Sequence, residues 1–268
     1  MKKLICAIFL LVSFGVLAQT ADVAFKSGCD KLQQKNYKGA IAEFNIAIKI
    51  KPNYAEAYYN RGFAMANIQD YNNAITDFNK AIQLKPNYTS AFSDRGSAEA
   101  SLQIFDAAIK DVNHAILLDP KFANAYYNRG HIKANMRDIK GAIADFSQAI
   151  MLDPTLSDAY FFRGTFNMDM QKFDLAISDF GHTIELCPQT VYAYYFKGIA
   201  EFKLNQYKNS LKDLDQTIAL NPQFADAYYD RGKTKQALKD NAGACSDWIN
   251  ASKLGNKDAE GMVIKFCK

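Results

Sequence analysis

A strict 34-residue period is the strongest constraint on how this chain folds. All six prolines keep this spacing, at Pro52, Pro86, Pro120, Pro154, Pro188 and Pro222. Seven glycines keep the same spacing, at Gly28, Gly62, Gly96, Gly130, Gly164, Gly198 and Gly232. Proline and glycine are the residues that helix interiors tolerate least, so their common register indicates a repeated structural unit. A fixed period of this length predicts an array of stacked units.

The period divides the chain into repeats, which we number from position 1 to position 34 with proline at position 32. Seven repeats then cover residues 21–54, 55–88, 89–122, 123–156, 157–190, 191–224 and 225–256, the last with Asn256 in place of proline. Position 8 is always glycine, and position 20 is alanine except for Ser210. Position 24 is bulky, with Phe44, Phe78, Val112, Phe146, Phe180, Leu214 and Trp248.

Each repeat has the hydrophobic spacing of two amphipathic helices, helix A and helix B. In the second repeat the spacing predicts helices over residues 55–68 and 72–84. A glycine inside helix A costs about 1 kcal/mol relative to alanine, so seven such glycines indicate a close approach between the paired helices. The proline predicts the end of helix B, because it lacks an N–H and biases the residue before it away from the helical conformation.

These positions closely resemble the tetratricopeptide repeat (TPR) family over residues 21–256. The resemblance implies an all-α, right-handed superhelical solenoid of about seven helix–turn–helix pairs. Residues 257–268 mix apolar and basic side chains, and we expect them to form a C-terminal capping helix. In the family, positions 2, 5, 6, 9, 12 and 13 of helix A line a concave binding surface.

Residues 1–18 have the pattern of a signal peptide. Lys2 and Lys3 precede an apolar run over residues 4–17, and a cleavage site follows Ala18. The run is shorter than the ~20 residues of a bilayer span, although an uncleaved membrane anchor is the alternative. Cleavage predicts an exported protein, periplasmic or extracellular and of the exported bacterial TPR type, with no membrane insertion afterwards.

Two of the four cysteines beyond the leader are placed for a disulfide. An antiparallel turn near residues 255–256 puts Cys245 and Cys267 at similar heights on neighbouring helices. The alternative is that they are two small buried residues. Cys29 and Cys187 are expected to stay unpaired. No cysteine or histidine spacing suggests a metal site, and the chain is expected to need no cofactor.

A second periodic feature pairs basic and acidic side chains. Position 7 is basic and position 23 is aspartate in repeats two to seven. The expected structural ion pairs are Arg61 with Asp77, Arg95 with Asp111, Arg129 with Asp145, Arg163 with Asp179 and Arg231 with Asp247, and Lys197 lies opposite Asp213. One carboxylate for each cation is what partial burial requires. The alternative is a basic stripe that binds an anionic ligand.

Aromatic and amide side chains at positions 5, 6 and 9 are the candidate binding residues. They are Tyr59, Asn60, Phe63, Tyr127, Asn128, His131, Phe161, Phe162, Tyr195, Phe196 and Tyr229. Amides pair with the backbone of an extended peptide, and rings take its side chains. The most apolar group, Phe161, Phe162, Tyr195 and Phe196, is the candidate anchor. The alternative is that these rings only fill contacts between successive A helices.

Composition and motifs limit the classes of function. The net charge of +4 is small and unclustered, so nucleic acid is not an expected partner. No nucleophile elbow, phosphate loop or HExxH motif is present, so catalysis is not expected. The prediction is a non-catalytic scaffold or adaptor that binds a protein or peptide in the cell envelope or outside the cell. The alternatives are a glycan-binding envelope module and a structural subunit of an envelope complex.

Overall fold

The computed structural model describes residues 20–267, and the regular structure in this range is entirely helical. The predicted signal peptide, residues 1–18, lies outside the described residues. Within residues 20–267, no helix is long and apolar enough to cross a membrane. The helical structure of residues 20–267 confirms the expected all-α class for the described chain.

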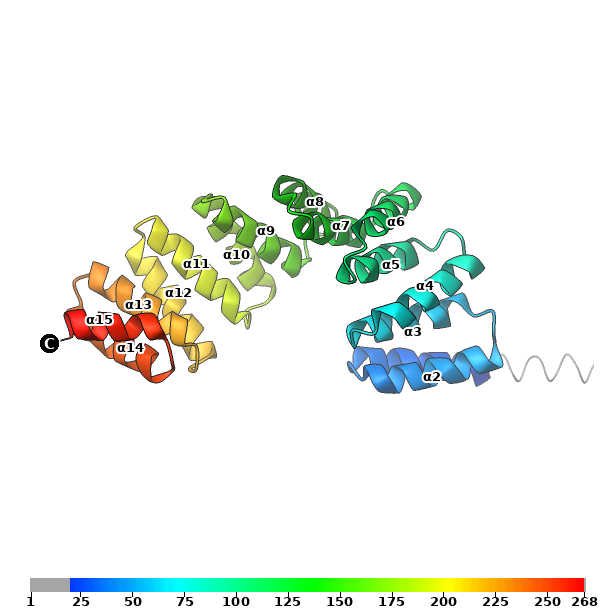
Figure 1. Cartoon of the computed structure of the whole chain (residues 1–268), viewed down its shortest axis with the longest axis horizontal. Coiled ribbons are helices and arrows are strands. Elements are labelled where there is room, and N and C mark those ends of the chain that lie inside the picture. Colours follow the sequence, from blue (N-terminus) through cyan, green and yellow to red (C-terminus); the bar gives the residue numbers. More distant parts are fainter. Residues whose placement is uncertain (1–19, 268) are drawn as a thin grey trace, which may run out of the picture. The chain divides into compact units, whose positions relative to one another are not determined.

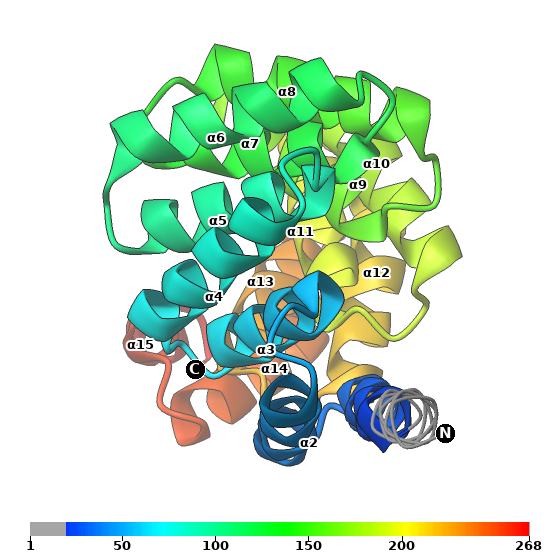
Figure 2. The ribbon, with the colours of Figure 1, turned by 90° about the vertical axis from the view of Figure 1, so that its right-hand side faces the viewer.

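The helices alternate as the A and B members of successive repeats, and within each unit the two helices of a repeat pack side by side, as α3 does with α4 and α13 with α14 (Figures 1 and 2). Helix A of the first repeat covers residues 20–33. The remaining A helices are α3 (Ala55–Asn67), α5 (Thr89–Ser101), α7 (Ala123–Asn135), α9 (Ser157–Asp169), α11 (Val191–Lys203) and α13 (Ala225–Ala237). The B helices are α2 (Tyr37–Ile50), α4 (Tyr71–Leu84), α6 (Phe105–Leu118), α8 (Ile139–Leu152), α10 (Phe173–Leu186), α12 (Tyr207–Leu220) and α14 (Asn241–Lys253).

Two compact units divide the chain, and the boundary falls inside α8. The first unit ends at Asp145 and the second begins at Phe146. In a repeat array each pair contacts mainly its neighbours, so the core is a series of local clusters. One such cluster in the first unit contains Ala108, Val112 and Ala125, and one in the second contains Trp248 and Ala259.

Backbone conformation at two positions ends the helices of each repeat. At position 15, between helix A and helix B, a residue other than glycine takes a left-handed conformation with φ between 56° and 67°; these residues are Lys35, Gln69, Gln103, Arg137, Gln171, Asn205 and Lys239. Before the proline, Lys85 and Asn221 both have φ of −138°, outside the helical region. The proline therefore ends helix B as the sequence predicts.

The glycine at position 8 lies directly against the bulky residue at position 24 of the same repeat. A Cβ added to Gly62 would stand 3.0 Å from the Phe78 ring and 3.1 Å from the Ala74 carbonyl oxygen. At Gly198 it would stand 3.1 Å from Leu214, and at Gly232 it would collide with Trp248. Glycine at this position therefore lets helix A reach both the buried ring and the backbone of helix B.

The last described helix is α15 (Lys257–Phe266), which lies within the capping helix expected over residues 257–268. The Asn256 side chain caps this helix by accepting from the Ala259 amide at 2.9 Å. Ala259 is 34 residues after Ala225, so α15 stands in the register of an eighth helix A. Its position 8 is Phe266, whose ring lies 5.7 Å from that of Trp248.

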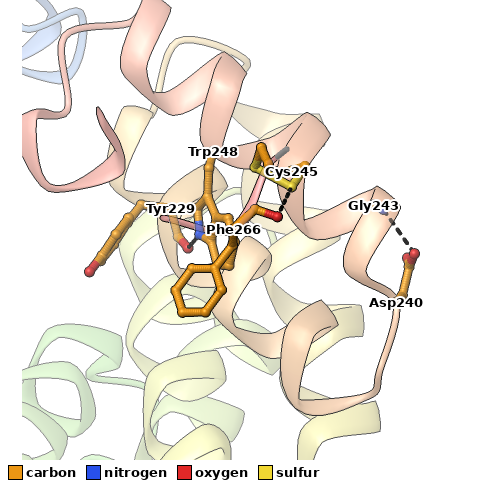
Figure 3. The surroundings of a disulfide bond; sticks show 7 residues. Tyr229, Asp240, Gly243, Cys245, Trp248 and Phe266 are labelled. Carbon is orange, nitrogen blue, oxygen red and sulfur yellow. Dashed lines mark hydrogen bonds between the residues drawn. A yellow bond between two sulfur atoms is a disulfide. The ribbon is translucent and has the colours of Figure 1, made fainter. Parts of the chain in front are cut away.

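A disulfide joins the end of α15 to α14. Cys245 and Cys267 are bonded, with their Cα atoms 5.5 Å apart, and the bond lies close to Trp248 and Phe266 (Figure 3). The bonded pair is the one that the hairpin argument places together. Cys29 and Cys187 have free thiols.

Candidate functional site

The position-7 arginines form ion pairs with aspartates of the same repeat. Arg61 donates from Nε and Nη2 to the two carboxylate oxygens of Asp77, each at 2.6 Å. The same two-bond geometry joins Arg95 to Asp111, Arg129 to Asp145, Arg163 to Asp179 and Arg231 to Asp247. The aspartates are 2–7% exposed, so each buried carboxylate has a matching cation.

A third bond extends each arginine to the helix B of the preceding repeat. Arg61 Nη1 donates to Asn45 at 2.6 Å, and Arg129 Nη1 donates to Asn113 at 2.7 Å. The guanidinium also lies over the ring at position 4, as Arg61 does over Tyr58 at 5.4 Å. Each arginine thus ties three helices together. This arrangement fits the ion-pair interpretation rather than a basic stripe, since a carboxylate already occupies the two-donor edge.

The helix-A face that carries the candidate binding residues has its own repeated contact. Position 5 of one repeat touches position 6 of the next, 35 residues later. Tyr59 donates to Asp94 at 2.7 Å and Tyr195 donates to Asp230 at 2.8 Å. The hydroxyl groups of Tyr59 and Tyr195 therefore join neighbouring A helices.

In the second unit four candidate rings form the aromatic patch: Phe161, Phe162, Tyr195 and Phe196. The Phe161 ring lies 5.6 Å from Phe162 and 6.1 Å from Phe196, and Tyr195 lies 5.4 Å from Phe196. All four are half-buried. The rings meet at angles between 53° and 81°, so their edges and faces interlock.

Further rings support the aromatic patch. Phe162 stacks on buried Phe146 at 6.1 Å, and Phe196 stacks on buried Phe180 at 5.9 Å. Tyr192, which is 57% exposed, stacks on Phe196 at 6.2 Å. The patch is therefore the outer part of a larger aromatic cluster whose inner rings belong to the core.

In the first unit a cavity of about 300 Å³ opens on the helix-A face. We call it the Asp94 pocket; its lining includes Phe63, Ala66, Asn67, Tyr71, Phe78, Asp94, Ser97, Ser101 and Asn128. Burial raises the pKa of Asp94 to about 6 from its ordinary value of 3.8, although bonds from Tyr59 and Asn128 act in the opposite direction. Burial and the nearby Asp94 charge also raise the pKa of Tyr59.

A larger cavity of about 740 Å³ is lined by residues of α5 and α6, among them Arg95 and Asp111. These two residues are bonded to each other at 2.5 Å as part of the arginine series. The larger cavity is lined by this matched pair and also by Glu99 and Lys110. The smaller Asp94 pocket is lined by two of the candidate binding residues, Phe63 and Asn128.

The remaining candidate residues are more scattered. Asn60 donates to the carbonyl of Glu56 in its own helix at 2.8 Å, so one amide donor is already used. Tyr127 makes an edge contact with His131 at 4.6 Å. Tyr229 accepts a bond from Trp248 through its backbone carbonyl and lies under the Lys233 ammonium group. The structure does not bring these residues into the Asp94 pocket or the aromatic patch.

Sequence reasoning missed Asp94, Ser97 and Ser101 as lining residues of the pocket. The candidate binding residues were chosen for aromatic rings and amides, so these small or acidic residues were left out. A usable signal was present, because Asp94 and Asp230 share position 6 but differ in the residue three places later. Within residues 20–267, no group of three or more acidic, histidine or cysteine side chains is arranged to hold a metal ion.

Family profiles identify the class of protein that this fold and surface define. The profile described as "TPR repeat" matches residues 30–69 and 198–239, and the profile "Tetratricopeptide repeat" matches residues 55–88 and 123–156. The chain belongs to the tetratricopeptide repeat family. Comparison with curated protein sequences gives no match.

Solved structures of TPR proteins share the fold. The chain is similar to pilF of Pseudomonas aeruginosa, with a TM-score of 0.66 and 14% identity over 77% of this chain and 94% of that one. A TPR protein from Parabacteroides merdae gives 0.56 and 18% identity over 92% and 98%. YrrB, described as a TPR protein with an unusual peptide-binding site, gives 0.54 and 20% identity over 70% and 97%. At these identities the likeness shows the fold alone.

Proposed function

We propose that this protein is a non-catalytic scaffold or adaptor that binds a protein or peptide partner through the helix-A face. The observation that carries the proposal is the aromatic patch, in which four half-buried rings stand on two successive A helices. Rings that are fixed by a core beneath them lose little conformational freedom on binding, which favours their use as anchors.

The helix-A face of the first unit also has chemistry that suits an extended peptide. The Asp94 pocket adds amide, hydroxyl and carboxylate groups beside the partly exposed Phe63 ring. Such groups pair with a peptide backbone and fix its register. One structural relative, YrrB, is described as having a peptide-binding site, which supports the same class of function.

The proposal places the protein outside the cytoplasm, in the periplasm or beyond the cell. The signal-peptide pattern of residues 1–18 is one support. The Cys245–Cys267 disulfide is a second, because disulfides persist in oxidising compartments and are rare in the cytosol. The four patch rings meet one another at angles between 53° and 81° and so do not form one flat surface, and no specific observation favours the glycan alternative.

The proposal is tested by affinity capture from a cell-envelope extract. The wild-type protein is expected to retain a specific protein, and Phe162→Ala combined with Phe196→Ala is expected to lose it. Because both rings also touch core phenylalanines, the pair Phe162→Leu and Phe196→Leu serves as a second variant that keeps more of the packed volume.

The matched control removes two exposed apolar side chains from a B helix of the same unit. Leu175 and Leu186 on α10 are 55% and 40% exposed, and their double alanine variant is expected to keep the partner. Retention of the partner by both phenylalanine variants, with their helical content and melting temperature intact, would move the binding surface away from the patch.

A further inference from the structure

Asp94 and Asp230 occupy the same position of the repeat and make the same first contact. Each stands at position 6, and each accepts a hydrogen bond from the tyrosine at position 5 of the preceding repeat. One lies in the first unit and the other in the second, so the chain contains two versions of one local arrangement.

In the second unit the arrangement is completed by an internal cation. Lys233 Nζ bonds Asp230 at 2.7 Å, and the ammonium group lies 5.5 Å from the centre of the Phe202 ring and 5.0 Å from that of Tyr229. A carboxylate on one side and aromatic faces on the other form a good environment for a positive charge.

In the first unit the equivalent positions carry neither a lysine nor an aromatic ring. The residue at the place of Lys233 is Ser97, and the residue at the place of Phe202 is Ala66. Both of these small residues line the Asp94 pocket. The cavity therefore opens where the second unit places a lysine and a ring.

Asp94 differs in its partners from the aspartates that are paired with arginine or lysine. Asp77, Asp145 and Asp247 each bind an arginine, and Asp230 binds a lysine. Within the described chain, Asp94 is bonded by the neutral groups of Tyr59 and Asn128 and takes part in no ion pair. A carboxylate accepts up to about four hydrogen bonds, so it has acceptor capacity left.

We propose that the Asp94 pocket binds a lysine or arginine side chain of a peptide bound to the helix-A face of the first unit. This inference rests on the proposed function and adds the chemistry of one peptide side chain. The bound cation takes the place that Lys233 occupies beside Asp230. The hydroxyls of Ser97 and Ser101 and the Asn67 amide line the same cavity and offer further acceptors for its N–H groups.

The protein groups around Asp94 leave its carboxylate available to a cationic ligand. Tyr59 on α3, Tyr88 before α5 and Asn128 on α7 are the neighbours that act on it electrostatically or by hydrogen bonds. None of them carries a positive charge, so a ligand cation is not displaced by an internal one. The exposed Phe63 ring, 39% accessible, offers an apolar wall for the aliphatic part of the side chain.

The test compares two fluorescein-labelled peptide pools that differ at one residue. Both pools are nonapeptides with random uncharged residues around a fixed centre, which is arginine in one and citrulline, its neutral isostere, in the other. Fluorescence anisotropy with the full chain is expected to show about tenfold tighter binding of the arginine pool, the scale of one charge-assisted bond.

Two variants address the pocket, and one serves as the control. Asp94→Asn keeps an acceptor for Tyr59 but removes the charge, and is expected to lower arginine-pool affinity to that of the citrulline pool. Ser97→Lys copies Lys233 and is expected to have the same effect while raising the melting temperature. Asp230→Asn, whose carboxylate already has a lysine, is expected to keep the arginine preference.

Equal binding of both pools by the wild-type protein, or an arginine preference that survives Asp94→Asn, would overturn this inference and leave the proposed function standing. If neither pool binds while the captured envelope protein still does, the pocket is not a peptide anchor and the inference fails alone. If neither the pools nor an envelope protein binds, the proposed function fails with it.

Discussion

Lys197 and Gly181 depart together from a rule that the other repeats keep. In repeats two, three, four, five and seven, the position-7 arginine donates to position 25 of the preceding repeat, as Arg95 does to Asn79 and Arg231 to Asp215. In repeat six the cation is a lysine, and position 25 of the preceding repeat is Gly181, which has no side chain to accept. Repeat six therefore lacks the guanidinium group that makes the third bond, and the preceding repeat lacks the side chain that would accept it.

This relationship predicts coupling between two substitutions in repeats five and six. Lys197→Arg alone is expected to change stability little, because the third donor has no partner. Combined with Gly181→Asn, it is expected to add about 0.5–1.5 kcal/mol beyond the sum of the single changes, the net value of one hydrogen bond. Chemical denaturation of the four proteins of this cycle measures the coupling, and purely additive effects would contradict it.

Gly62→Ala is expected to be strongly destabilising. The new Cβ would stand 3.0 Å from the Phe78 ring and 3.1 Å from a backbone oxygen that cannot move without its helix. We expect a loss of about 2–3 kcal/mol, within the range for overpacked cores. The control is Gly181→Ala, where a Cβ would meet nothing within 4 Å and alanine should add up to about 1 kcal/mol through helix propensity. Equal effects in thermal unfolding would show that close packing is not the reason for glycine at position 8.

Asp145→Ala is expected to lower the melting temperature. Asp145 is 4% exposed and binds both Arg129 and Lys133, each at 2.7 Å, so its loss leaves two cations without their carboxylate. The expected cost is about 3 kcal/mol, as for other broken buried pairs. Exposed Asp169 at the end of α9 is the control, and Asp169→Ala should change little. Unchanged stability of Asp145→Ala would argue against a structural role for the pairs.

The Cys245–Cys267 bond predicts a mass signature and a stability effect. Intact-mass measurement without reductant should find these two thiols oxidised, while Cys29 and Cys187 react with an alkylating reagent after unfolding. Cys267→Ser is expected to cost about 3 kcal/mol, because the bond closes a loop with a sequence separation of 22. Cys187→Ser is the matched control. Two free thiols at Cys245 and Cys267 in the purified protein would contradict the pairing.

Asp94→Asn is expected to stabilise the protein at neutral pH. The pKa of Asp94 is raised to about 6 in the fold from an ordinary 3.8, so the fold favours the protonated form. This group's stabilisation is full below the unfolded pKa and is lost as pH rises through about 6. The variant should therefore exceed the wild type by about 3 kcal/mol at pH 7.5, and the difference should shrink to about 0.5 kcal/mol near pH 4. Thermal unfolding at both pH values measures it, and a constant difference would contradict the assignment.

The repeat architecture could be predicted because it depends on residue types with strong local effects. Proline at position 32 ends helix B through the residue before it, and glycine at position 8 marks the close approach to the ring at position 24. The Arg–Asp pairs followed from charge matching between the two helices of one repeat. Each of these contacts lies within a repeat or between neighbours, so the period alone brings the partners together.

The candidate binding surface was less predictable, because its character depends on contacts between repeats. The left-handed turns between helix A and helix B could not be predicted either, because the residues at position 15, such as Gln171 and Lys239, are not glycine. The Asp94 pocket arises from small side chains at Ala66 and Ser97, and a missing side chain leaves no pattern in a single repeat. It became visible only by comparison with Lys233 and Phe202 in the second unit.

The sixteen-residue spacing between Arg61 and Asp77, repeated along the array, also bears on how the chain reaches its folded state. Even the contacts that join successive A helices, such as Tyr59 with Asp94, span only 35 residues. Loops of this length close quickly, and proteins dominated by local contacts fold in microseconds to milliseconds. We therefore expect rapid folding that can nucleate in any repeat and spread to its neighbours.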